Sequence, residues 1–160
     1  MSSLMSDRLA IVSVIDPDDF ASGTTLGDVI DMRYHEELMF IVLAGDLNTA
    51  CTIDLKVTQS TASGGTFTPI SGKSITQITE ASSTQDDSQS IINLKASELS
   101  SGYRFVKARL LIGGVGGTGV KSGVAVLTLA SRTRFSDAVY TTTFGDLLRC
   151  WRSWPKATYR

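Results

Sequence analysis

Residues 50–60 alternate between apolar and polar side chains, and this period of two constrains the fold more than any other feature of the chain. The apolar set is Cys51, Ile53, Leu55 and Val57, and the polar set is Thr52, Asp54, Lys56 and Thr58. Successive side chains of a β-strand point to opposite faces of the sheet. The segment Ala50–Ser60 is therefore predicted to be an antiparallel strand with one buried face and one solvated face.

Further strand patterns recur along the chain, separated by turns rich in Gly, Ser, Asp and Pro. Glu37–Ala44 is apolar on both faces, which predicts a central strand. Asp16–Asp19 is predicted to be a turn, and Ser97–Ser100 a single helical turn. The remaining predicted strands are Arg8–Ile15, Gly27–Met32, two short strands within Phe67–Ile78, Ser90–Ala96, Tyr103–Ile112 and Ser122–Ala130. About eight or nine short strands without a long helix predict an all-β, jelly-roll-like antiparallel sandwich.

The last stretch, Phe144–Arg160, differs from this body because aromatic and basic residues are interleaved in it. We divide the chain into a β-sandwich body, residues 1–131, and a C-terminal arm, residues 132–160, that is extended or partly helical. Trp, Tyr and Arg dominate protein interfaces. The predicted partner-binding residues of the arm are Arg149, Trp151, Arg152, Trp154 and Tyr159. The alternative is that the arm packs back on its own domain.

Charge is small overall but unevenly placed. The formal net charge is −1, which argues against a general nucleic-acid binder. The arm holds six Lys/Arg and two Asp/Glu, a net of +4, whereas the body holds nine and fourteen, a net of −5. Stacking on the aromatic residues of the arm offers a route to single-stranded nucleic acid, but the acidic body would repel a polyanion.

Other features of the sequence exclude several classes of protein. The two cysteines, Cys51 and Cys150, are too few for a disulfide framework, and Cys51 is predicted to be a buried apolar residue. We expect no signal peptide and no transmembrane helix, so the compartment of synthesis is a reducing cytoplasm.

Candidate catalytic and metal-binding residues are few, and we interpret each as structural. His35 is the only histidine and precedes an apolar strand, which favours a solvated turn. Asp16, Asp18 and Asp19 lack the spacing of a helix–loop–helix calcium site and are typical of a turn. We therefore predict no catalytic, cofactor or metal site, and no enzymatic activity.

Four segments resemble a group of small virion proteins of tailed bacteriophages. They read SGTTLGDVIDMRYHEELMFIVLAGDL, CTIDLKVTQSTASGGTFTPISGKSITQIT, QSIINLKASEL and YRFVKARLLIGG. The shared order is a long apolar strand, a glycine turn, an alternating strand, a glycine loop, F-T-P-I-S-G and a later arginine-containing strand, Tyr103–Ala108. The resemblance covers roughly Leu26 to Leu129, and the arm has no counterpart in it.

This resemblance implies a structural virion protein. Some members of the group resemble capsid decoration or cement subunits with a β-sandwich fold, so we expect the chain to bind the major capsid protein or other virion subunits. It implies a location on the capsid exterior after synthesis in the bacterial host cytoplasm, and a dimer or trimer. No cofactor, nucleic acid or membrane partner is expected. A head–tail or tail component is an alternative within the same class.

A glycan-binding β-sandwich module, used for adhesion or receptor recognition, is the alternative from another class. Sugar rings stack on exposed aromatic side chains. The aromatic residues of the body, such as Phe40 and Phe105, fall mainly within predicted strands, and both tryptophans lie in the arm. This distribution favours docking on a protein over sugar recognition.

The loop Gly113–Val120 is predicted to bind no nucleotide. Gly114, Gly116 and Gly119 formally match a dinucleotide fingerprint, but that fingerprint requires a following helix, and here a strand pattern follows. Calorimetric titration with ATP or NAD should show no binding. Heat of binding that is abolished by Gly116→Val would contradict this prediction.

Overall fold

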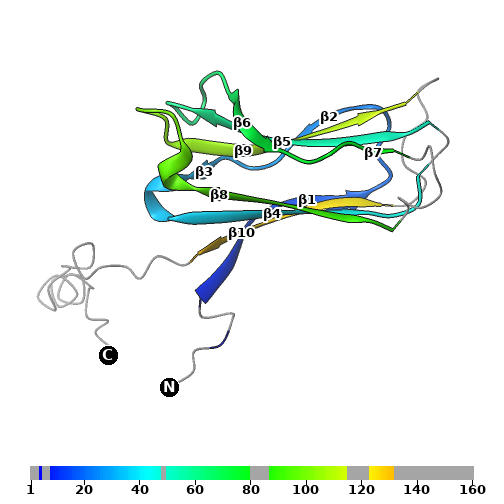
Figure 1. The fold of residues 1–160 in the computed structure, drawn as a ribbon, viewed down its shortest axis with the longest axis horizontal. Helices are drawn as coiled ribbons and strands as arrows, with labels where there is room; N and C mark the ends of the chain where they lie inside the picture. Colours follow the sequence, from blue (N-terminus) through cyan, green and yellow to red (C-terminus); the bar gives the residue numbers. More distant parts are fainter. Residues whose placement is uncertain (1–3, 5–7, 48–49, 80–86, 115–122, 132–160) are drawn as a thin grey trace, which may run out of the picture.

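The computed structural model describes residues 4, 8–47, 50–79, 87–114 and 123–131, and these form two antiparallel sheets packed face to face (Figure 1). In spatial order, the first sheet consists of β1 (Leu9–Asp18), β10 (Val124–Ser131), β4 (Glu37–Ala44) and β8 (Gln89–Lys95). The second consists of β2 (Gly23–Leu26), β9 (Phe105–Gly113), β5 (Thr52–Ser60) and β6 (Thr68–Ser74), with β3 (Ile30–Asp31) paired to β9 and β7 (Ile78–Thr79) paired to β5.

The strand order is that of a jelly roll. When the two-residue strands β3 and β7 are set aside, eight strands remain, and every connection except β5 to β6 passes from one sheet to the other. The first strand then lies beside the last, and the second beside the next to last. This is the double-sheet arrangement by which jelly rolls bring together strands that are distant in the sequence. The predicted fold class is confirmed.

The core lies between the sheets and follows the alternation seen in the sequence. Cys51, Ile53, Leu55 and Val57 are all fully buried, as predicted. Phe40 of β4 is the largest of the fully buried side chains. Residues at alternate positions of β9 and β10 complete the same cluster. Burial of these side chains is the main favourable term that holds the two sheets together.

Strand β1 continues past its predicted end. Asp16–Asp18 was expected to form a turn, but it extends the strand, and the pairing with β10 shifts register between Ile15 and Asp18. Pro17 is tolerated there because β1 is an edge strand and the shift removes the need for a ladder hydrogen bond. The prediction of a turn was wrong because it rested on local residue types, and these do not show where a strand lies in its sheet.

Two other local predictions need correction. The predicted strand Gly27–Met32 is reduced to β3, followed by the 3-10 turn η1 (Met32–Tyr34), and β2 precedes it without having been predicted. Thr58 was expected on the solvated face but is buried, and its hydroxyl donates to the carbonyl oxygen of Lys107 at 3.0 Å. A buried hydroxyl with a partner is tolerated, so alternation alone does not decide its exposure.

The helical content is small, as predicted. The helical elements within the described residues are two three-residue 3-10 turns, η1 and η2 (Ala96–Glu98). Glu98 fixes η2, because its carboxylate accepts from the Lys95 backbone N–H at 2.8 Å and from the Lys73 ammonium at 2.7 Å. The predicted helical turn at Ser97–Ser100 therefore exists one residue earlier.

An ion pair ties the end of β3 to the residue before β9. The Arg104 guanidinium donates twice to the Asp31 carboxylate, with Nε 2.6 Å from Oδ1 and with Nη2 bonded to Oδ2. The backbone N–H of Arg33 donates to the same carboxylate at 3.0 Å. The hydrogen bond from Arg104 is the main cause of a lowered pKa at Asp31, and partial desolvation opposes it.

We expect Asp31→Asn to lower the free energy of unfolding at pH 7 by about 1 kcal/mol, because the pair is only partly shielded from water. A carboxyl with a lowered pKa in the folded state contributes stability above its unfolded pKa of about 3.9 and loses it as the pH falls through the folded value. Urea unfolding at pH 7 and at pH 3 should therefore show a difference between variant and wild type that shrinks in acid. Asp54→Asn is the matched control, since Asn still accepts from Gln77. An Asp31→Asn effect independent of pH would contradict this account.

Candidate interaction surface

The outer face of the first sheet is apolar. Phe40 points into the core, so its neighbours Met39 and Ile41 point outward. The register places Val14, Leu127, Ile41 and Ile91 in one row across β1, β10, β4 and β8. The next row contains Ile11, Leu129, Met39 and Asn93. We call the following set the apolar face: Ile11, Val14, Met39, Ile41, Leu43, Ile91, Leu127 and Leu129.

Several of these side chains are open to solvent. Ile11 is 59% exposed, Ile91 53%, Leu43 42% and Val14 40%. From the spacing of four strands and the rise along them, the apolar face covers roughly 400 Å². Contiguous apolar patches of this size lie within the range of the largest patch on a monomeric protein and often mark an interaction site. An antiparallel sandwich ordinarily presents polar residues at such positions.

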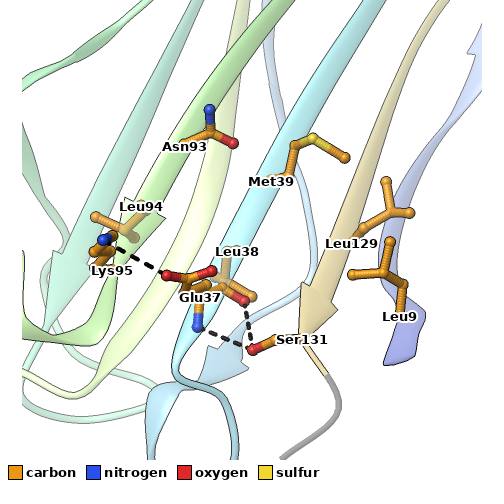
Figure 2. A pocket seen from close by; sticks show the side chains of 9 residues that line it. All are labelled: Leu9, Glu37, Leu38, Met39, Asn93, Leu94, Lys95, Leu129 and Ser131. Atoms are coloured by element: carbon orange, nitrogen blue, oxygen red, sulfur yellow. Dashed lines mark hydrogen bonds and ion pairs between the residues drawn. The ribbon is translucent and has the colours of Figure 1, made fainter. Parts of the chain in front are cut away.

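Polar residues border the apolar face at one end (Figure 2). A hollow there is lined by Leu9, Met39 and Leu129, with Glu37 and Ser131 at its edge. The Glu37 backbone N–H donates to the Ser131 hydroxyl at 3.1 Å, and the Glu37 carboxylate lies 3.7 Å from the ammonium of Lys95. The last described residue of β10 therefore lies at the rim of the apolar face.

A second hollow lies at the other end of the same face. It is lined by Val14, Pro17, Leu43, Ala125 and Leu127. Its side chains come from β1, β4 and β10, so the hollow exists only where these strands meet. The apolar face thus runs the length of the sheet between two shallow depressions.

The outer face of the second sheet is different. Lys56 of β5 and Arg109 of β9 are exposed and paired in register. Asp54 accepts from the Gln77 side chain at 2.7 Å beside them, and the exposed apolar residues of this face are Leu26, 50% exposed and in register with Arg109, and Leu111, 38% exposed. The sandwich is therefore asymmetric, with one solvated outer face and one apolar outer face.

The sequence contains a signal for the apolar face in two segments, and only one of them, Glu37–Ala44, entered the prediction. Glu37–Ala44 was interpreted as a central strand because both of its faces are apolar, and β4 does lie between β10 and β8. Val124–Ala130 has the same double apolar pattern. Two neighbouring strands of this kind predict a sheet that is apolar on both sides, and the core covers one side only.

The predicted binding residues of the arm lie outside the described residues. These are Arg149, Trp151, Arg152, Trp154 and Tyr159. Most of the loop Gly113–Val120 also lies outside them, and Gly113 itself ends β9 opposite Thr52. The roles assigned to the arm and the loop stay predictions.

His35 and the aspartates near β1 occupy structural positions. His35 is half-buried after η1, with Nδ1 3.5 Å from the Ser131 carbonyl oxygen. Asp19 accepts the backbone N–H of Gly123 at 3.0 Å and joins β1 to β10. Within the part of the chain that the structure describes, no three His, Cys, Asp or Glu side chains gather in the manner of a metal site. In that same part, no helix has the length and apolar character needed to cross a bilayer.

Three aromatic residues of the described body, Phe40, Tyr34 and Phe67, are not open on both faces of their rings. Phe40 is fully buried. Tyr34 is 46% exposed, but the Arg33 guanidinium lies 4.8 Å from its ring centre. Phe67 is half-buried, with the Lys107 ammonium 4.0 Å from its ring centre. A cation thus already occupies one face of each of these two rings.

The fold and the surface together define an antiparallel jelly-roll sandwich with one apolar outer face. No family model and no curated protein matches the sequence. A search of solved structures finds a chain in the structure of infectious bursal disease virus Gx strain, with 11% identity and a TM-score of 0.45. The match covers 78% of this chain and 32% of that chain, so this chain spans about a third of that chain's length.

Adjacent residues of β4 allow a test of the two faces. We expect Phe40→Ala to lower the free energy of unfolding by about 3–5 kcal/mol, because it leaves a cavity in a closed core. Ile41→Ala should cost about 1 kcal/mol, since the outer face can lose methyl groups without leaving a void. Urea unfolding at low protein concentration measures both. Equal losses for the two variants would mean that the outer face is covered within a single molecule.

Proposed function

We propose that this chain is a structural protein of a tailed-bacteriophage virion, and specifically a decoration or cement subunit that binds the shell of major capsid protein and stabilises it. The observation that supports this most directly is the apolar outer face on a rigid jelly-roll body. Jelly rolls occur in viral capsid proteins, lectins and cupins, so the fold permits the role without choosing it. The resemblance of residues 26–129 to small virion proteins favours it.

A cement subunit needs adhesive surfaces on a stable scaffold, and it needs no reaction chemistry. The core between the two sheets supplies the scaffold. The apolar face supplies one adhesive surface, and we assign a second to the arm. Many copies bound side by side on a shell convert modest contacts into strong overall attachment. In this role the chain acts as a homo-oligomer on the capsid exterior and not as an enzyme.

Within the arm, we propose that Trp151 and Trp154 are the anchors, supported by Arg149, Arg152 and Tyr159. Tryptophans three residues apart, with Pro155 directly after them, present two large apolar rings within a short segment. Burial of such a ring at an interface is worth on the order of 2–4 kcal/mol. The neighbouring cations would set the approach and register against acidic groups.

Two rivals make different use of the same body. A head–tail or tail component would use the same surfaces at another position in the virion. A glycan-binding module would need open aromatic rings, and the described rings of Tyr34 and Phe67 each have a cation over one face. The exposed apolar face contains no aromatic side chain on which a sugar ring could stack, which favours the structural role.

The test uses the phage whose genome encodes the chain. We expect mass spectrometry of gradient-purified virions to detect the protein, and electron microscopy of particles lacking it to show a regular surface lattice when the purified protein is added. Trp151→Ala/Trp154→Ala should lower the amount bound to such particles at least about tenfold. Tyr34→Ala, an exposed aromatic change on the body, is the matched control and should bind as wild type.

Absence of the protein from purified virions would refute the virion role. Its presence only at the head–tail vertex or along the tail would refute the decoration role and would still support a structural virion protein. Binding of host glycans by the isolated protein, with no binding to particles, would support the rival module.

A further inference from the structure

We propose that the apolar face binds the arm, residues 132–160, of a second copy of this chain, so that each copy both donates an arm and accepts one. This inference rests on the proposed function for the docking role of the arm, and it names a neighbouring copy on the shell, and not the shell itself, as the partner that the arm and the apolar face bind. A heterologous contact of this kind links identical subunits head to tail and closes into rings when the rotation allows.

The extent of the apolar face argues for an added segment instead of simple contact between two bodies. Two faces of roughly 400 Å² pressed together would bury about 800 Å² in total, below the roughly 1,200 Å² of a stable specific interface. Ile11 and Ile91 are the most exposed members and lie on the edge strands β1 and β8, so the open area spans the full width of the sheet. A peptide laid across this width adds the missing area.

The arm begins at the rim of this face. Ser131 ends β10 beside Leu9 and Glu37 (Figure 2). The start of β1 and the end of β10 lie on the side of the first sheet that is turned away from the second sheet (Figure 1). Ser131, the last described residue before the arm, therefore lies at the rim of the apolar face (Figure 2).

The sequence after Ser131 favours a neighbour over the chain's own face. The thirteen residues 132–144 contain no Gly, Pro or Asn, and they are rich in Thr and aromatic residues. Thr and aromatic residues favour an extended chain, whereas Ser136 and Asp137 within this segment are of types that turns also use. Thirteen extended residues reach about 43 Å, whereas an eight-residue strand such as β4 is about 27 Å long. The tryptophans would then lie beyond the sheet from which their own arm starts.

Charge also favours contact between copies. The arm has a net charge of +4 and the rest of the chain −5. Glu37, which also lies 3.7 Å from the Lys95 ammonium, borders one end of the apolar face, and Asp16 and Asp18 lie on β1 towards the other end. Cations of an arriving arm therefore meet carboxylates at both borders, while its aromatic rings meet the apolar rows between them.

The experiment measures self-association of the full-length chain by sedimentation velocity over a range of concentrations. The acceptor variant is Ile11→Asp/Ile91→Asp, and the donor variant is Trp151→Ala/Trp154→Ala. Leu111→Asp, on the outer face of the second sheet, is the control. We expect the acceptor and donor variants each to raise the Kd of association at least about tenfold, and the control to leave it unchanged.

Circular dichroism and thermal melts establish that each variant is folded, and Ile11→Ser/Ile91→Ser replaces the acceptor variant if the aspartates disturb the sheet.

Mixing the two defective variants gives the decisive result. The acceptor variant keeps an intact arm and the donor variant keeps an intact face, so their mixture should form a one-to-one complex that neither forms alone. A donor variant that associates like wild type, or a mixture that forms no complex, would overturn the proposal. If the wild-type chain is monomeric and Ile91→Asp shifts its tryptophan emission, the arm lies on its own body. This result would also overturn the proposal. If the copies exchange arms but the protein is absent from purified virions, this inference is supported and the proposed function is refuted.

Discussion

Burial between the two sheets is the interaction on which the rest of the structure depends. Phe40, Leu55 and Leu110 are fully buried there, and they come from β4, β5 and β9, which are brought together only by the jelly-roll order. Each of these strands must expose its alternate residues on the outside of the sandwich. The character of each outer surface is therefore fixed by residues that take no part in the core.

That constraint leads to different results on the two sheets. On the second sheet, the outward positions hold residues such as Lys56 and Arg109, which water solvates well. On the first sheet, the outward positions hold Met39, Ile41 and Leu127, which water does not. Stability of the sandwich needs only the inner set. The outer apolar set has a cost in solubility, and for that reason we assign it to binding.

Much of the fold could be predicted because it depends on local pattern. Strand β4 was predicted with its observed bounds, and the burial of Cys51 and Ile53 followed from their spacing. The failures occurred where the position in the sheet overruled residue type. Pro17 sits in a strand because that strand is an edge with a shift in register, and burial of Thr58 is tolerated because its hydroxyl donates a hydrogen bond to the Lys107 carbonyl oxygen. Neither fact can be deduced from the residue and its neighbours in sequence.

The sequence by itself determined which residues of a regular strand such as β4 share a side, because side chains alternate along an extended chain. On β1 the register shift between Ile11 and Ser13 breaks this alternation and puts Ile11 and Val14 on the same side. The sequence also determined the unequal charge of body and arm. Only the tertiary structure decided that Val14, Leu127, Ile41 and Ile91 stand in one row, because their four strands are far apart in the chain and are aligned by ladder register. The physical reason is that register depends on hydrogen bonding between partners and on packing of the opposite face. A continuous apolar surface is therefore a property of the assembled sheet and not of any one of its strands.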